Sequence, residues 1–395
     1  MEVNKKSTLF LNGIKGVAAV GVFTHHFCLS FFPSIYYGAV DNVKLPNNLE
    51  IIFGQSALSF VVNGNFWVCV FLMLSAFVLT NKIYVACHEK NISVGYLIKL
   101  ILDRYVSLCV PVFISSLFIL ILFKSHLLLN LEISNTYTYS PWLSSFYTED
   151  LSVFELIRTS FWGVSFSGNS LFNTVFWMLQ YILWGSFIAI FDGMLLYSFG
   201  LKGGIVMSVF AGLSLLSGSY YSCIFLGSIL SQIWMYSVQS QKKMVWILIL
   251  IFGAFLGGYP TGFIPNNYYK VLSFFSVFKV NLSFFFHVIG AFLLLLATIR
   301  INLFEKIFDI SIFKFFAKYN FQIYLFHIPV LFSIGMLIFK NCYGFIDSYT
   351  ICVILTYLVV FIVVILVSIL YKKIVDDEFM KYIKYKINEI CMEEK

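Results

Sequence analysis

Long apolar segments, separated by short polar connections, form the main pattern of this chain. We find about ten segments that approach or reach the roughly 17 to 25 residues that a helix needs to cross a bilayer. Their approximate bounds are 9–31, 63–82, 104–123, 172–193, 201–217, 219–237, 244–259, 281–299, 319–339 and 350–371. Because a bilayer core offers backbone groups no water to bond with, the pattern predicts an all-α, polytopic membrane helix bundle.

The distribution of basic residues predicts how these helices are oriented. Cytoplasmic connections of membrane proteins carry an excess of Lys and Arg. With the N-terminus inside, the cytoplasmic segments hold nineteen Lys and Arg residues and the external segments hold six. Both termini are therefore predicted to be cytoplasmic. The net charge of +7 is explained by topology and does not indicate a nucleic-acid partner.

Composition supports a membrane protein and indicates no particular kind of reaction. Hydrophobic residues make up 60% of the chain and charged residues 11%, whereas a soluble domain carries about a quarter charged. The eight Cys form no CxxC pair and no metal-ligand cluster with the six His, so we predict neither a disulfide framework nor a metal site. The run after Lys5 and Lys6 has no small-residue cleavage site, and we interpret it as a retained first span.

Two long regions, a loop and the C-terminal tail, lie outside the predicted spans. The external loop over about 124–171 is long enough to have a function, and we leave open whether it covers a substrate or only connects two spans. Residues 372–395 place apolar side chains at helical spacing among lysines, which predicts a cytoplasmic amphipathic helix on the membrane surface. We therefore divide the chain into a membrane domain, 1–371, and a tail, 372–395.

The first span contains ionisable residues where lipid favours none. Lys15, His25 and His26 lie within the apolar run from Leu11 to Phe27. Lys15 and His26 are eleven residues apart, which is close to three helical turns and about 16 Å, so both side chains lie on one helix face. Such a stripe is expected to line a cavity and to have a function. His25 points about 100° away and is expected to have a supporting part.

Five segments together resemble the acyltransferase 3 family over nearly the whole chain. The run LNGIKGVAAVGVFTHHF is similar to the family's opening motif, with Lys15 at the place of its Arg and His26 at the place of its His. The second-span signature ending Leu-Ser-Gly-Phe is matched by Leu74, Ser75, Ala76 and Phe77. The segment DRYVSLCVP resembles the basic run that opens the third span, with Arg104 matching its first Arg.

Two later segments complete the resemblance. FWMLQYILWGSF resembles a fourth-span pattern that this chain matches at Trp177, Tyr181, Gly185 and Ser186, and KYNFQIYLFHIPVLF resembles a ninth-span signature matched at Tyr324, Leu325, His327 and Pro329. The chain departs from the family pattern at the later Arg of the third-span run, where it has Leu108, and at three polar positions of the expected cavity. Asn12 replaces an Asp, Lys15 an Arg and Ile182 a Glu. A Lys keeps the charge of Arg but lacks its bidentate fork.

The resemblance implies an integral membrane enzyme that transfers acyl groups to glycans. Transfer to a sugar hydroxyl needs a base, and His26 suits that role because the free pKa of His lies near 6.5. A neutral His bonded to a backbone carbonyl is the alternative. Lys15 and Arg104 suit the phosphates of a cytoplasmic donor such as acetyl-CoA, although topology alone also explains a basic residue at the position of Arg104.

Further candidates are cavity-lining or supporting residues, each with a structural alternative. His327 precedes Pro329, and a proline in a helix opens a kink by freeing a carbonyl. Ser75 next to Ala76 also permits close helix packing. The supporting set is Asn12, His25, Ser75, Trp177, Tyr181, Tyr324 and His327.

The sequence therefore favours a multi-pass bacterial inner-membrane O-acyltransferase, expected to be an O-acetyltransferase. Its partners are acetyl-CoA, the bilayer and a hydroxyl of a capsule, O-antigen or related polysaccharide or of its lipid-linked precursor, with no bound cofactor. The first alternative is a transporter or flippase for a lipid-linked glycan, which the absence of internal repeats disfavours. The second is a non-catalytic family member, suggested by Asn12 and Ile182. The oligomeric state stays open.

Overall fold

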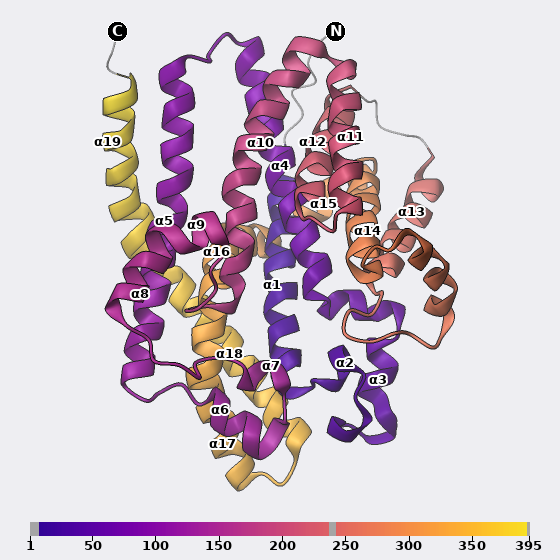
Figure 1. Cartoon of the computed structure of the whole chain (residues 1–395), viewed down its shortest axis with the longest axis vertical. Coiled ribbons are helices and arrows are strands. Elements are labelled where there is room, and N and C mark those ends of the chain that lie inside the picture. Colours follow the sequence, from indigo (N-terminus) through magenta and orange to yellow (C-terminus); the bar gives the residue numbers. More distant parts are fainter. Residues whose placement is uncertain (1–7, 237–241, 393–395) are drawn as a thin grey trace. The chain divides into compact units, whose positions relative to one another are not determined.

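The computed structural model describes residues 8–236 and 242–392, and every regular element in these residues is a helix (Figure 1). The longer helices are α1 (Phe10–Phe31), α4 (Gly64–His88), α5 (Val94–Lys124), α10 (Trp177–Phe199), α11 (Leu201–Leu216), α12 (Tyr221–Tyr236), α13 (Lys243–Gly257), α14 (Leu282–Thr298), α16 (Ser311–Val330), α17 (Met336–Phe345), α18 (Tyr349–Tyr371) and α19 (Lys381–Met392). The helical fold class is thus confirmed.

Shorter helices and 3₁₀ or π segments connect the longer ones. They are α2 (Ser34–Tyr37), η1 (Val40–Asn42), η2 (Pro46–Asn48), α3 (Leu49–Gly54), η3 (Ala57–Val62), α6 (Asn130–Ile133), η4 (Ser134–Thr138), α7 (Pro141–Ser144), α8 (Val153–Arg158), η5 (Thr159–Gly163), α9 (Val164–Ser167), η6 (Thr174–Phe176), η7 (Tyr268–Phe278), α15 (Asn302–Phe308), η8 (Leu331–Gly335) and η9 (Lys372–Met380).

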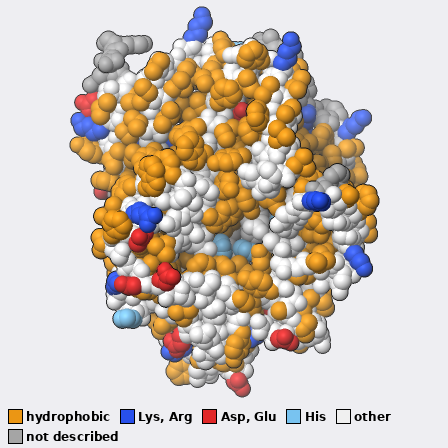
Figure 2. Space-filling view, in the orientation of Figure 1, with side chains coloured by type: hydrophobic (Ala, Val, Ile, Leu, Met, Phe, Trp, Pro, Cys, Tyr) orange, Lys and Arg blue, Asp and Glu red, His pale blue; other side chains and the backbone are white. Residues whose placement is uncertain are grey.

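Six helical stretches in the described residues are long and apolar enough to cross a membrane. They are Phe10–Phe31, Gly64–His88, Val94–Lys124, Thr174–Phe199, Ser311–Phe345 and Tyr349–Cys391, and the bent pair Tyr268–Val277 and Leu282–Thr298 makes a seventh if it counts as one span. Hydrophobic side chains cover most of the face in Figure 2, with few charged ones among them. This surface fits a chain surrounded by lipid.

The prediction of about ten spans is not confirmed. Each predicted segment does coincide with a helix, but α11, α12 and α13 have only 16, 16 and 15 residues. At 1.5 Å per residue such helices reach about 24 Å or less, which is short of a typical hydrocarbon core. The cytoplasmic placement of both termini stays a prediction, and residues 1–7 and 393–395 lie outside the described residues.

The chain divides into two compact units, which we describe separately. Unit 1 comprises residues 1–22, 55–101 and 181–318, and unit 2 comprises residues 23–54, 102–180 and 319–395. In unit 1, α13 and α14 approach each other where small residues meet, because a Cβ added to Gly253 would lie 2.8 Å from the carbonyl oxygen of Gly290. In the same unit His287 is buried, and its Nε2 donates to the Tyr259 carbonyl over 2.9 Å.

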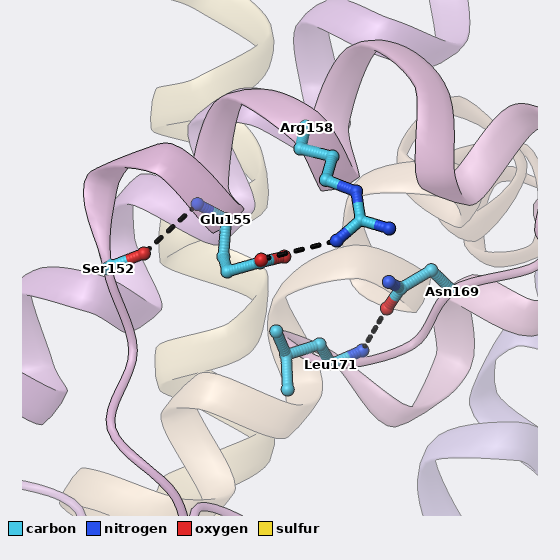
Figure 3. Close-up of polar contacts among 5 residues, drawn as sticks. All are labelled: Ser152, Glu155, Arg158, Asn169 and Leu171. Carbon is cyan, nitrogen blue, oxygen red and sulfur yellow. Dashed lines mark hydrogen bonds and ion pairs between the residues drawn. The ribbon is translucent and has the colours of Figure 1, made fainter.

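The predicted external loop is folded in unit 2 as a series of short helices. Ser152 begins α8 by accepting a hydrogen bond from the Glu155 amide at 3.1 Å, and Arg158 donates to the Glu155 carboxylate at 3.3 Å (Figure 3). The side chain of Asn169 accepts a bond from the Leu171 amide at 2.8 Å. Local capping therefore gives this loop a defined backbone.

The tail continues the last span as a helix. Segments η9 and α19 follow α18 without a break, from Lys372 to Met392. The predicted helix is present up to that point, and its location on the inner membrane surface stays a prediction.

Glu50 is a buried carboxyl outside the candidate spans. Its side chain is 0% exposed, and Oε1 accepts bonds from the backbone amides of Lys44 at 2.5 Å and Leu45 at 2.9 Å. These two bonds close the loop that precedes α3.

We expect Glu50→Gln to remove one source of pH-dependent stability. Burial raises the pKa of Glu50 above 4.5, although the amide bonds from Lys44 and Leu45 lower it in part. Folding therefore favours the protonated carboxyl, so its contribution is complete below the unfolded pKa and is lost as the pH rises through the raised pKa.

Thermal unfolding in detergent, followed from about pH 4 to about pH 8, checks this expectation. The melting temperature of the wild type should fall relative to that of the Gln variant as the pH increases. Parallel curves would contradict it.

Candidate active site

The structure brings His26 and His327 into direct contact in unit 2. His26 lies on α1 and His327 on α16, and His26 Nδ1 is 2.9 Å from His327 Nε2. The two rings stack with centroids 5.0 Å apart. His327 is fully buried, whereas His26 is only partly buried. The pair therefore has one member enclosed in protein and one with access to a ligand.

A backbone carbonyl determines which nitrogen of each ring carries hydrogen. His327 Nδ1 lies 3.0 Å from the carbonyl oxygen of Ile323, which can only accept, so His327 donates from Nδ1. Neutral His327 then has its lone pair on Nε2, and His26 must donate to it from Nδ1. The lone pair of neutral His26 therefore lies on Nε2. This nitrogen is the one that can take a proton.

Pro329 frees a backbone carbonyl of α16, and two side chains bind to it. Pro329 has no amide hydrogen, so the carbonyl of Leu325, four residues earlier, loses its helical partner. Asn173 donates to this carbonyl over 2.8 Å and Ser115 over 3.4 Å. The π segment η8 follows directly, and there Ser333 donates to the Pro329 carbonyl over 2.5 Å. Where the sequence predicts a kink, the structure has a carbonyl bound by two side chains and a local π distortion.

Trp142 from the loop covers the His26 ring. The indole of Trp142 stacks on His26 with centroids 5.2 Å apart and planes at 20°. Ser140, at the start of α7, donates to the Leu29 carbonyl of α1 over 2.6 Å and accepts from the Leu143 amide. These bonds fix α7 beside α1 and hold Trp142 against His26.

His25 and Tyr324 support this centre. His25 is buried, with its ring 5.2 Å from that of His26 and 5.6 Å from that of Tyr36. Tyr324, one turn before His327 on α16, donates its hydroxyl hydrogen to the Val175 carbonyl, which ties α16 to η6. Trp177 is half-buried at the start of α10 in the same unit.

Four predicted site residues lie in unit 1. Asn12 and Lys15 are half-buried on the first part of α1, and Lys15 Nζ lies 6.0 Å from the centre of the Phe71 ring on α4. Ser75 donates to the Phe71 carbonyl of its own helix over 2.8 Å. Tyr181 packs against the rings of Tyr220 and Tyr221. A shared site of Lys15 and His26 stays a prediction, as does donor binding by the half-buried Arg104 of unit 2.

Ile182, which stands where the family pattern has a Glu, lies beside a very small cavity in unit 1. Ile182 and Ser75 line this space of about 10 Å³ together with Leu72, Ala76, Gly185, Ser186 and Ile224. Ser186 donates to the Ile182 carbonyl over 2.6 Å. The cavity has room for about one water molecule, so these side chains are closely packed, and the predicted role of Ser75 in lining a cavity stays a prediction.

Sequence reasoning missed Trp142 and the pairing of His26 with His327. A signal for Trp142 was present, because it lies in the Tyr, Ser and Thr-rich part of a loop long enough to have a function. The pairing joins residues 301 positions apart, and helical spacing carries no information over such a distance. In the described part of the chain, no group of three or more His, Cys, Asp or Glu is arranged to hold a metal ion.

Comparison with known proteins gives one result. The family model described as an acyltransferase domain matches residues 8–373, which covers nearly the whole chain. No curated protein and no solved structure matches the chain.

Proposed function

Because the chain belongs to the acyltransferase 3 family, we propose that it is a bacterial inner-membrane O-acetyltransferase that transfers an acetyl group from acetyl-CoA to a hydroxyl of a surface polysaccharide or its lipid-linked precursor. That the chain is a membrane acyltransferase follows from its family and its apolar helices. The resemblance of the sequence motifs to the family supports acetyl-CoA as the donor and a glycan as the acceptor.

The hydrogen bond between His26 and His327 is the observation that carries this proposal. A sugar hydroxyl attacks a thioester slowly until its proton is removed. In the proposed reaction, His26 Nε2 takes that proton as the hydroxyl oxygen attacks the acetyl carbonyl. The C–S bond then breaks, the acetyl group stays on the sugar as an ester, and CoA leaves as a thiol with the proton from His26.

His327 and Trp142 make His26 a better base in this reaction. When His26 becomes an imidazolium, its Nδ1–H still donates to His327 Nε2, and His327 is held by the Ile323 carbonyl. An orienting partner of this kind keeps a histidine in the correct tautomer and stabilises its charged form. The Trp142 ring adds a cation–π contact and shields one face of His26 from water.

Lys15 is proposed to bind a phosphate of the donor. Its ammonium lies on the part of α1 nearer the N-terminus, which the predicted orientation places toward the cytoplasm, where acetyl-CoA is available. Arg104 is proposed to assist it. Both roles are suited to the pyrophosphate and 3′-phosphate of CoA, because Lys and Arg form charge-assisted bonds with phosphate.

We expect Lys15→Ala to raise the KM for acetyl-CoA about tenfold, because a charge-assisted hydrogen bond contributes about 1.5 kcal/mol or more. Lys15→Arg should keep most of the affinity, since it keeps the charge. Initial rates with the purified chain at varied acetyl-CoA measure this effect. Lys82→Ala, on the exposed part of α4, serves as the control. An unchanged KM in Lys15→Ala would remove Lys15 from donor binding.

The proposed function is tested by deleting the gene and analysing the surface polysaccharide by NMR. We expect the O-acetyl signals to disappear and to return on complementation with the wild-type chain. Unchanged acetyl signals in the deletion strain would overturn the proposal. Loss of the polysaccharide itself from the cell surface would instead support the transporter alternative.

A further inference from the structure

A pocket opens in the folded loop of unit 2, apart from the pair of His26 and His327, which we call the histidine centre. It has a volume of about 440 Å³, and its lining residues are Phe123, Lys124, His126, Leu128, Asn130, Leu131, Tyr147 and Asp150. We call it the loop pocket. Its volume lies within the range of sites that hold small ligands. All of its lining residues belong to the end of α5 or to the loop that follows.

The charges of the loop pocket cancel. Lys124 Nζ lies 2.6 Å from Asp150 Oδ1, and the hydrogen bond from Lys124 lowers the pKa of the Asp150 carboxyl, so that this group is ionised at neutral pH. The lining therefore combines one positive charge with one negative charge. Together these two side chains carry no net charge with which to select an anion or a cation.

The polar groups and rings of the loop pocket suit a sugar. Asn130 uses both amide hydrogens, donating to the carbonyls of Leu143 at 3.0 Å and Phe146 at 3.1 Å, so its Oδ1 remains an acceptor for a ligand. The rings of Phe123 and Tyr147 lie 6.4 Å apart. A sugar unit has hydroxyls around its rim and an apolar face, which match polar side chains and aromatic rings respectively. An acyl chain would leave the polar lining unpaired.

Two residues that line this pocket have an uncommon backbone conformation. His126 and Tyr147 both adopt positive φ angles, 56° and 60°. This conformation is uncommon for a bulky residue such as Tyr147, and it persists where the surrounding structure holds it. The Tyr147 hydroxyl donates to the Phe172 carbonyl over 2.7 Å, which holds this ring in position.

The loop pocket is joined to the histidine centre by aromatic contacts. The ring of Tyr147 lies 6.0 Å from that of Phe332, which lies 5.4 Å from Trp142, and Trp142 stacks on His26. Asn130 holds the same segment from within the pocket, through the Leu143 and Phe146 carbonyls. A ligand in the pocket is thus bound next to the segment that covers the base.

We propose that the loop pocket binds a neutral sugar unit of the acceptor glycan, with Phe123 and Tyr147 against the sugar face and Asn130, His126, Lys124 and Asp150 on its hydroxyls. This inference rests on the proposed function for the identity of the glycan as acceptor. Sugar binding itself is measurable without any acetyl transfer.

The first experiment measures binding to the purified full chain in detergent, without acetyl-CoA. The probes are the methyl glycosides of glucose, galactose and N-acetylglucosamine, observed by saturation-transfer-difference NMR. We expect at least one glycoside to bind and its affinity to fall about fivefold in Phe123→Leu, because the loss of an aromatic contact costs about 1 kcal/mol. His126→Asn, which tolerates the positive φ, should also weaken binding.

Matched control variants separate the pocket from general effects. Phe154→Leu replaces an exposed aromatic residue of α8 outside the pocket, and Lys90→Asn replaces another residue with positive φ, in unit 1. Both should bind the glycoside as the wild type does. If no glycoside binds, or if Phe123→Leu and His126→Asn both bind normally, the inference is overturned. Displacement of the glycoside by inorganic phosphate would equally overturn it, since it would reveal an anion site.

The second experiment links the pocket to the reaction. With the glycoside that binds as acceptor, we expect Phe123→Leu to raise its KM about fivefold and to leave the KM for acetyl-CoA unchanged. Glycoside binding that is lost in the pocket variants, together with unchanged polysaccharide acetylation in the deletion strain, would overturn the proposed function and keep the sugar site. The two failures are therefore distinguishable.

Discussion

Replacing His26 with alanine is expected to lower acetyl transfer by a factor of about 10² to 10⁴, the usual contribution of a general base. The loss is expected because His26 presents a basic nitrogen beside Trp142 while it donates to His327. The rate is measured as acetyl incorporation from labelled acetyl-CoA into glycan by the purified chain.

His26→Gln separates the chemistry of His26 from its packing. Glutamine fills part of the ring volume and can donate toward His327, but it has no basic nitrogen. We expect it to be as inactive as the alanine variant, with a thermal stability near that of the wild type. His88→Gln, an exposed histidine of α4, is the matched control and should keep full activity. Appreciable activity in His26→Gln would show that His26 is not the base.

His327→Ala is expected to reduce kcat by a factor of about 10 to 100, the range found when the hydrogen-bond partner that orients a metal-bound histidine is lost. His327 is a positioning residue, because it acts through His26 and is itself fully buried. Without its Nε2, His26 loses the acceptor that determines its tautomer. The KM for acetyl-CoA should change little, since the donor is proposed to bind elsewhere.

His327→Gln provides the rescue that a purely structural role would not predict. Its Oε1 can accept the bond from His26 Nδ1, so this variant should recover part of the kcat lost in His327→Ala. Leucine fills a similar volume without an acceptor, and His327→Leu should behave like the alanine variant. Equal activity of the Gln and Leu variants would assign His327 to packing at the α16 distortion instead.

The sequence predicted the fold class and the family because both depend on local and ordered features. Apolar runs of membrane length and the positions of five motifs are properties of the chain itself, and the helical class and the family membership are confirmed. The number of spans is harder to predict. Segments 201–217, 219–237 and 244–259 are predominantly apolar, but where each helix begins and ends depends on packing, and the described helices α11, α12 and α13 have 15 or 16 residues.

The candidate site was also predicted only in part from the sequence. Helical spacing predicted a stripe of Lys15 and His26, and the family motif suggested His327 as a supporting residue, but neither indicated that His26 and His327 share a hydrogen bond. The interpretation of His327 as a residue at a kink missed its main contact. The effect of Pro329 was foreseeable as a freed carbonyl, whereas the donors that satisfy it, Asn173 and Ser115, come from distant segments.

By itself, the sequence determined that this is a helical membrane protein of the acyltransferase 3 family with ionisable groups in its first span, because hydrophobic period and motif order are encoded residue by residue. Tertiary structure alone decided that His26 meets His327, that Trp142 covers it and that a loop becomes a pocket. The two contacts of His26 join segments one hundred or more residues apart. Their formation depends on how helices pack, and hydrogen bonds to freed carbonyls and capped turns hold them in place.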